Sequence, residues 1–198
     1  MFRLDNLIEQ WAHIYAPLQH PLEATAKPRD RRFFRIDALD QESEWSRNAD
    51  MIQHPVVCFP TRIDAEVDRQ KPKFVSRAWG IYLMTPQTTV NPAQQTGLEA
   101  TDCKLLLDEM GMDLLGFLFD LQDVAGGHSW RKDTPQSVRS LYDRLTDEER
   151  RQIRGLRLEE TRWWSAPKSF GRWWILGFEV EGLDPRPLCI LPKKYIEE

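Results

Sequence analysis

The segment 98–125 constrains the possible fold more than any other part of this chain. Its apolar side chains recur at every third or fourth position, which is the spacing of an amphipathic helix. One stripe consists of Leu106, Met110, Leu114, Phe117, Leu121 and Val124, and Leu105, Leu107, Met112, Leu115, Leu118 and Phe119 widen it. Because the apolar surface nearly encircles the helix, other elements must cover most of it. The sequence therefore predicts a long, covered helix that ends at Gly126-Gly127.

Alternation of apolar and polar residues predicts the strands that would cover this helix. In residues 74–84, Val75, Trp79, Ile81 and Leu83 share one face, which is typical of a strand. A preceding strand over residues 56–67, interrupted at Pro60, is expected to pair with it in antiparallel fashion through a turn at residues 68–72. The proline is better suited to an edge or a bulge than to the centre of a sheet.

Shorter patterns complete the expected element order. A strand is predicted over residues 33–37, and the apolar positions of residues 3–16 predict an amphipathic helix that Pro17 ends. Short helices are expected to begin at Asp40, at Thr134 as an N-cap before Pro135, and at Thr146 with a capping box that includes Glu149. Residues 85–97, rich in Pro, Thr and Gln, are expected to form a loop.

This order predicts a fold class. Strands that come as hairpins with helices between them indicate an α+β protein. We expect residues 1–198 to form a single α+β domain, with an antiparallel sheet of about four to five strands packed against a long central helix and additional short helices.

Composition excludes several classes of protein. Of the 198 residues, 41% are hydrophobic, which disfavours intrinsic disorder, and the net charge of −4 disfavours a general nucleic-acid binder. No apolar run approaches the roughly 20 residues that cross a bilayer, and no secretory signal is visible at the start of the chain. The three cysteines form no CxxC pair, which favours a reducing cytoplasm, and Cys58 and Cys189 are expected to be small buried hydrophobes.

The sequence predicts no catalytic, cofactor-binding or metal-binding residue. It contains no phosphate-binding glycine loop and no GxSxG nucleophile motif. Although His54 and Cys58 are four residues apart, Pro55 prevents a shared helical face, and no second pair completes a zinc site. The alternative is a hydrolase or nuclease whose site is assembled from dispersed residues such as Asp108, Glu109 and His128.

The closing hairpin combines aromatic and basic residues. Strand-like alternation occurs at Leu156 and Leu158 and again over residues 174–180, with a turn expected at residues 165–169. The candidate interface residues on this hairpin are Trp163, Trp164, Arg172 and Trp173.

Successive side chains of a strand point to opposite faces, so one tryptophan of each adjacent pair cannot enter a one-sided core. Tryptophan and arginine are favoured anchors of protein–protein interfaces, which makes an interface one interpretation. A sheet covered on both faces, and a platform for stacking single-stranded nucleic acid, are the alternatives.

The element order resembles that of the tail-terminator and tail-completion proteins of tailed phages and prophages. The residues that carry the resemblance are the opening helix Leu4–Tyr15, the strand pair Val56–Val67 and Phe74–Met84, the helix over residues 98–125 and the closing stretch Arg157–Leu191. The likeness is one of pattern and order, without a specific motif. It implies a small α+β sheet flanked by helices, and subunits that assemble as rings at the end of the tail tube.

Together these observations favour a non-enzymatic structural protein of a phage or prophage tail that acts through subunit contacts. Its expected partners are further copies of itself and other tail proteins, with no membrane and no nucleic acid. The expected location is the cytoplasm of a bacterial host or the virion. An adaptor that binds a peptide or a single strand along the aromatic hairpin is a further alternative.

Overall fold

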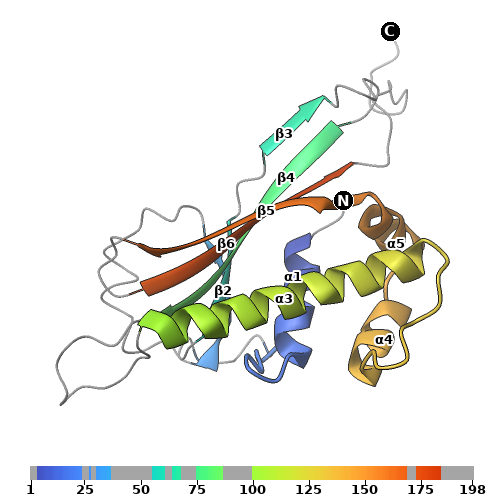
Figure 1. Cartoon of the computed structure of the whole chain (residues 1–198). Coiled ribbons are helices and arrows are strands. Elements are labelled where there is room, and N and C mark those ends of the chain that lie inside the picture. The colour runs from blue at the N-terminus through green and yellow to red at the C-terminus, as the bar shows by residue number, and fades with distance from the viewer. Residues whose placement is uncertain are drawn as a thin grey trace, which may run out of the picture.

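The protein has an α+β fold, seen in a computed structural model in which the helices lie together on one side of a sheet (Figure 1). The described residues are 4–23, 27, 30–36, 55–60, 64–67, 75–86, 100–168 and 173–183. Their helices are α1 (Leu4–Ile14), α3 (Ala100–Ala125), α4 (Gln136–Asp143) and α5 (Asp147–Arg154). Their strands are β1 (Phe33–Ile36), β2 (Val56–Pro60), β3 (Asp64–Val67), β4 (Val75–Pro86), β5 (Leu156–Lys168) and β6 (Trp173–Leu183).

The sheet is mixed, so the prediction of an antiparallel sheet is wrong in one pairing. The strand order is β1-β2-β4-β6-β5, and β3 also pairs with β4, which gives six strands rather than four to five. β1 runs parallel to β2, with Phe33 opposite Val57, whereas the other pairs are antiparallel. The prediction took neighbouring strands as hairpins, but residues 37–55 between these strands are long enough to return the chain in the same direction.

The strand pair before the long helix is confirmed. β2 and β3 both pair antiparallel with β4, β2 near its C-terminal end and β3 near its start. Pro60 lies opposite Ile36 of β1, beyond the last residue of β2 that pairs with β4, Cys58. A residue without an N–H group is therefore placed where the ladder with β4 has already stopped.

The helix expected over residues 98–125 is present as α3, a helix of 26 residues that packs across β4, β5 and β6. It lies very close to the sheet at Gly111. A Cβ atom at this position would lie 2.6 Å from Cζ of Phe178 and 2.7 Å from Cδ2 of Leu176, both on β6. Only a residue without a side chain lets the helix axis lie this close to the strand.

The main hydrophobic core lies between this helix layer and the sheet. It unites residues from α1, α3, α4 and α5 with those on one face of β1, β2, β4, β5 and β6. The ring of Trp11 on α1 is 6.4 Å from that of Phe117 on α3, so the two helices lie side by side. A smaller buried cluster on the opposite face of the sheet consists of Ile36, Val56, Cys58, Met84 and Ile175.

Of the predictions for single segments, some are confirmed and two are wrong. α1 and the capping box of Thr146 and Glu149 are confirmed, and α3 ends directly before Gly126. Thr134 is not an N-cap, because α4 begins after Pro135 and the Thr134 hydroxyl instead donates to Asp120 Oδ2 at 2.9 Å. The turn expected at residues 165–169 is wrong, since β5 continues through Lys168.

Some predictions fall on other parts of the chain. The short helix from Asp40, the turn at residues 68–72, most of the loop at residues 85–97, and Cys189 lie outside the described residues. Cys58 is fully buried, as expected for a small hydrophobe, and burial raises the pKa of its thiol far above the usual range.

Candidate interaction site

The candidate interface residues whose side chains the structure describes, Trp163 and Trp164, lie on β5, the last strand of the sheet order. β5 pairs with β6 alone among the described strands, so its other edge is the end of the described sheet. In register, Trp163 lies opposite Phe178 and Trp164 opposite Gly177. The two tryptophans therefore point to opposite faces of the sheet, as the alternation predicted.

Trp163 lies on the face that α3 covers. Its ring stacks on that of Phe178 with the centroids 5.9 Å apart and the planes at 27°. Phe178 is buried beneath Gly111, whereas 48% of Trp163 is exposed. Trp163 therefore extends the main core to the edge of the sheet and presents the rest of its ring to solvent.

Trp164 lies on the opposite face and covers a glycine. A Cβ atom at Gly177 would lie 2.5 Å from Cζ2 of Trp164, so the indole rests directly on the backbone of β6. The Tyr82 ring on β4 meets it edge to face, with centroids 5.9 Å apart at 61°. Because 43% of Trp164 is exposed, these two rings form an aromatic surface on the face without described helices.

The remaining candidate residues add little described geometry. Trp173 begins β6 opposite Lys168 and Pro86, and its side chain is not described. Arg172 lies outside the described residues. Trp174, which follows Trp173 on β6, is half-buried against the main core.

Charged groups of both signs surround the aromatic surface. Arg162 lies opposite Glu179 in the register of β5 and β6, on the same face as Trp164. Arg157 Nη1 lies 3.6 Å from Glu181 Oε2. Burial, and to a lesser extent the charge of Glu179, raise the pKa of Tyr82. The mixed charges suit a protein surface better than a phosphate backbone, which needs a basic track.

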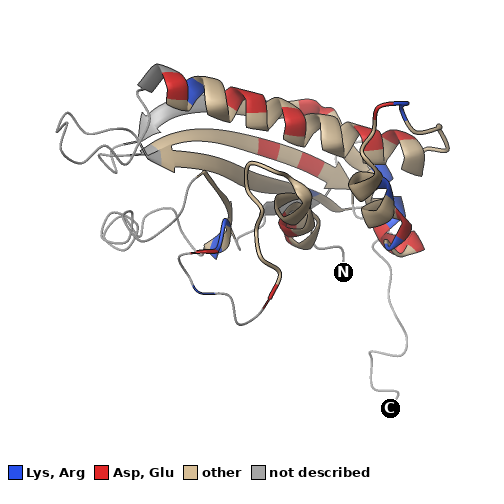
Figure 2. Cartoon of the chain, turned by 90° about the horizontal axis from the view of Figure 1, so that it is seen from below, with Lys and Arg blue, Asp and Glu red and all other residues tan. Residues whose placement is uncertain are grey.

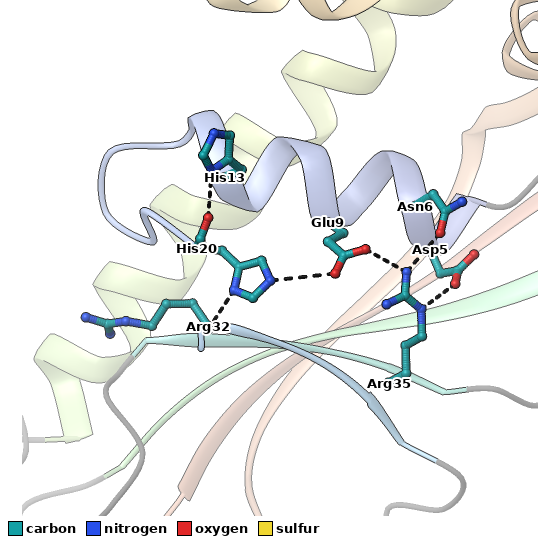
Figure 3. Close-up of polar contacts among 7 residues, drawn as sticks. All are labelled: Asp5, Asn6, Glu9, His13, His20, Arg32 and Arg35. Carbon is teal, nitrogen blue, oxygen red and sulfur yellow. Dashed lines mark hydrogen bonds and ion pairs between the residues drawn. The ribbon is translucent and has the colours of Figure 1, made fainter. Parts of the chain in front are cut away.

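A second polar cluster joins α1 to β1, at the other end of the sheet (Figure 3). Arg35 Nε donates to Asp5 Oδ2 at 2.6 Å, and its Nη2 donates to Glu9 Oε2 at 2.8 Å and to Asn6 Oδ1 at 2.9 Å. One guanidinium thus holds both carboxylates. Burial alone would lower the pKa of Arg35, but the hydrogen bonds and charges of Glu9 and Asp5 outweigh it and raise that pKa. This geometry anchors the four-residue strand β1 to the helix.

His20 forms the inner part of this cluster (Figure 3). His20 is 3% exposed, its Nδ1 accepts the backbone N–H of Arg32 at 3.1 Å, and its Nε2 lies 3.6 Å from Glu9 Oε1. His13 Nδ1 lies 2.7 Å from the carbonyl oxygen of His20. Burial lowers the pKa of His20, and the nearby Glu9 carboxylate opposes that shift. These contacts fix the chain that follows α1 and place no nucleophile beside the imidazole, so the described geometry indicates a structural role.

The structure does not bring the dispersed catalytic candidates together. Asp108 and Glu109 lie in the first half of α3, and His128 follows its end. At 1.5 Å per residue, the 16 residues from Glu109 to Ala125 span roughly 24 Å of helix. Within the described part of the chain, no group of three or more His, Cys, Asp or Glu residues could hold a metal ion. His54 is outside it.

Two parts of the site were missed in the sequence. Tyr82 and Gly177 complete the surface around Trp164, and the alternation of Gly80, Tyr82 and Met84 opposite the core positions already placed Tyr82 on that face. The Arg35 cluster depends on contacts 26 to 30 residues apart, for which no local pattern exists.

Comparisons with protein-family models, with curated proteins and with solved structures found no match to this chain. The resemblance to tail-terminator proteins therefore stays a prediction from element order. No helix among the described residues is long and apolar enough to cross a membrane.

Proposed function

We propose that this chain is a non-enzymatic structural protein of a phage or prophage tail, with a tail-terminator or tail-completion role, and that it acts by binding further copies of itself and other tail proteins. The observation that carries the binding role is the exposure of two adjacent tryptophans on opposite faces of the terminal strand β5. The tail assignment is supported by the order of opening helix, strand pair, long helix and closing hairpin. The corresponding location is the cytoplasm of a bacterial host before assembly and the virion afterwards.

The exposed surface of the two tryptophans determines how much free energy a partner could gain by covering them. Burying a large apolar side chain contributes roughly 1.5–3 kcal/mol relative to leaving it exposed. Trp163 is 48% exposed and Trp164 is 43% exposed, so about half of the surface of each residue is still available for burial. A partner that covers both side chains would therefore gain roughly 1.5–3 kcal/mol, a typical contribution for interface anchors.

The first experiment is the absolute mass of the purified chain by light scattering across a concentration series. We expect self-association of the wild type, and weaker association for Trp163→Ala and Trp164→Ala. Leu22→Ala is the matched control, because Leu22 is 43% exposed but lies outside β5. The proposal predicts that the tryptophan variants lose association more than they lose monomer stability, and equal losses would contradict it.

The rival functions have their own readouts. Arg162 beside Trp164 is the feature that favours single-stranded nucleic acid, and tryptophan quenching by an oligonucleotide that weakens steeply with salt would support that function. Turnover of generic phosphoester substrates, lost in Asp108→Asn or His128→Gln, would support the hydrolase or nuclease. Neither result is expected under the structural role.

A further inference from the structure

Helix α3 exposes a second apolar surface, separate from β5. Leu105 is 63% exposed and Met112 is 59% exposed, although both are large hydrophobic residues. They are seven residues apart, or two helical turns, and therefore lie on the same side of the helix. Both belong to the N-terminal half of α3. We call the side chains of Leu105, Asp108, Glu109 and Met112 the helix stripe.

The helix stripe lies in an acidic environment. α3 contains six acidic residues and one base: Asp102, Asp108, Glu109, Asp113, Asp120 and Asp123 against Lys104. Figure 2 shows acidic residues along the length of this helix. A second copy of α3 packed against it would place like charges together, which is unfavourable. The partner surface should therefore combine an apolar depression with a positive charge.

Such a surface exists between α1 and α4. A cavity of about 340 Å³ there is lined by Leu7, Leu141 and Leu145, with Arg144 and Glu149 among its polar residues. Leu7 and Leu141 are buried. This volume is in the range of pockets that hold small ligands, so it has room for an apolar side chain. We call it the α1–α4 pocket.

The charges at the α1–α4 pocket leave a cation available. Glu149 is engaged in the capping box, where its carboxylate accepts the N–H and the hydroxyl of Thr146 at 2.8 Å each. Arg144 is exposed and forms no ion pair with any residue in the described part of the chain. Residues 131–154 as a whole contain seven bases and five acids, opposite in sign to α3.

The two surfaces lie on different parts of the helix layer. α4 and α5 are located at the C-terminal end of α3, where Arg154 Nε donates to the carbonyl oxygen of Ala125 at 2.9 Å (Figure 1). The helix stripe is in the other half of α3. One copy therefore presents an acidic apolar stripe on one half of α3 and, beside α4, a pocket whose Arg144 forms no ion pair with the described residues.

We propose that the helix stripe of one copy docks into the α1–α4 pocket of a second copy, with Met112 in the pocket and Glu109 beside Arg144. The proposal rests on the self-association in the proposed function and adds a second contact surface to the one on β5. Different patches meet in this contact, so it is head-to-tail, and repetition produces a closed ring or an open filament.

The test uses two variants that each remove one surface. Met112→Asp disables the stripe and retains the pocket, whereas Arg144→Glu disables the pocket and retains the stripe. Both residues are exposed, so both variants should fold. We expect each variant alone to self-associate about tenfold more weakly than the wild type by light scattering, and an equimolar mixture to form a 1:1 dimer more readily than either variant alone. Lys132→Glu, an exposed charge change outside the pocket lining, is the control and should assemble as the wild type does.

Charge exchange provides a second readout. Glu109→Arg or Arg144→Glu should each weaken self-association about tenfold, and the double variant should recover most of this loss. A mixture that associates no more strongly than either variant alone, or single variants that assemble as the wild type does, would overturn the inference. If those variants assemble while Trp163→Ala and Trp164→Ala do not, copies meet through β5, and the proposed function stands without this contact. A wild type that is monomeric at every concentration overturns the inference and leaves the proposed function only contacts with other proteins.

Discussion

Two glycines of α3 provide a test of how the helix meets the sheet. At Gly111, a Cβ atom would lie 2.6 Å and 2.7 Å from the side chains of Phe178 and Leu176, while at Gly116 nothing lies within 4 Å. Both changes to alanine gain helix propensity, about 1 kcal/mol. Only Gly111→Ala also forces a methyl group into a filled site.

The effect of Gly111→Ala on the free energy of unfolding depends on whether Phe178 and Leu176 can move. Ordinary van der Waals contact begins at about 3.4 Å, so each side chain would have to retreat by nearly 1 Å. Phe178 and Leu176 are both buried in the main core, where overpacking costs about 1–3 kcal/mol. We therefore expect Gly111→Ala to lower the free energy of unfolding by up to about 2 kcal/mol, and Gly116→Ala to raise it by about 0.5–1 kcal/mol.

The assay is urea unfolding followed by tryptophan fluorescence, with thermal unfolding in parallel. For a chain of this size, 1 kcal/mol corresponds to a shift of about 2–4 °C in Tm. The comparison of the two variants cancels helix propensity and isolates the close approach to β6. If Gly111→Ala proves as stable as Gly116→Ala, the packing of α3 on β6 is not as described and the reasoning is refuted.

Three further predictions concern the other sites. Burial lowers the pKa of His20 below its ordinary 6.5, so the unfolded chain binds more protons and the free energy of unfolding should fall as the pH drops below about 6.5. His20→Gln should flatten this pH dependence in urea titrations at pH 5–7.5, and an unchanged slope would contradict the prediction. Arg35→Met removes the bonds that hold β1 to α1 and should lower the free energy of unfolding by about 1–2 kcal/mol. Because 1 M salt screens the ion pairs of the wild type, the difference in stability between wild type and variant should shrink in 1 M salt, and a variant as stable as the wild type would argue against these bonds. Gly177→Ala should displace the Trp164 ring and change the near-ultraviolet circular dichroism, yet reduce the free energy of unfolding by less than about 1 kcal/mol because Trp164 is partly exposed. An unaltered spectrum would count against the contact between Trp164 and Gly177.

The sequence predicted the elements whose causes are local. α1, α3 and the capped helix α5 follow from apolar spacing and from Thr146 with Glu149, each readable within one segment. The opposite orientations of Trp163 and Trp164 follow from the period of a strand.

What was missed depends on distant parts of the chain. The parallel pairing of β1 and β2 joins strands that residues 37–55 separate in the sequence, and the continuation of β5 through Pro167 is set by its pairing with β6. Pro167 and its neighbours resemble a turn locally, but the ladder to Trp174 outweighs that preference. The Arg35 cluster likewise exists only after α1 and β1 have come together.

The edge of β5 indicates how a partner would have to bind. A register shift interrupts its pairing between Arg157 and Arg162, and Pro167 lacks an N–H group near its end. Bulges, prolines and charged residues such as Glu160 are features that protect a terminal strand from pairing with another strand. A partner is therefore expected to cover the exposed faces of Trp163 and Trp164 rather than add a strand to β5. That mode explains why both tryptophans can be exposed at a sheet edge without making the edge itself a template for aggregation.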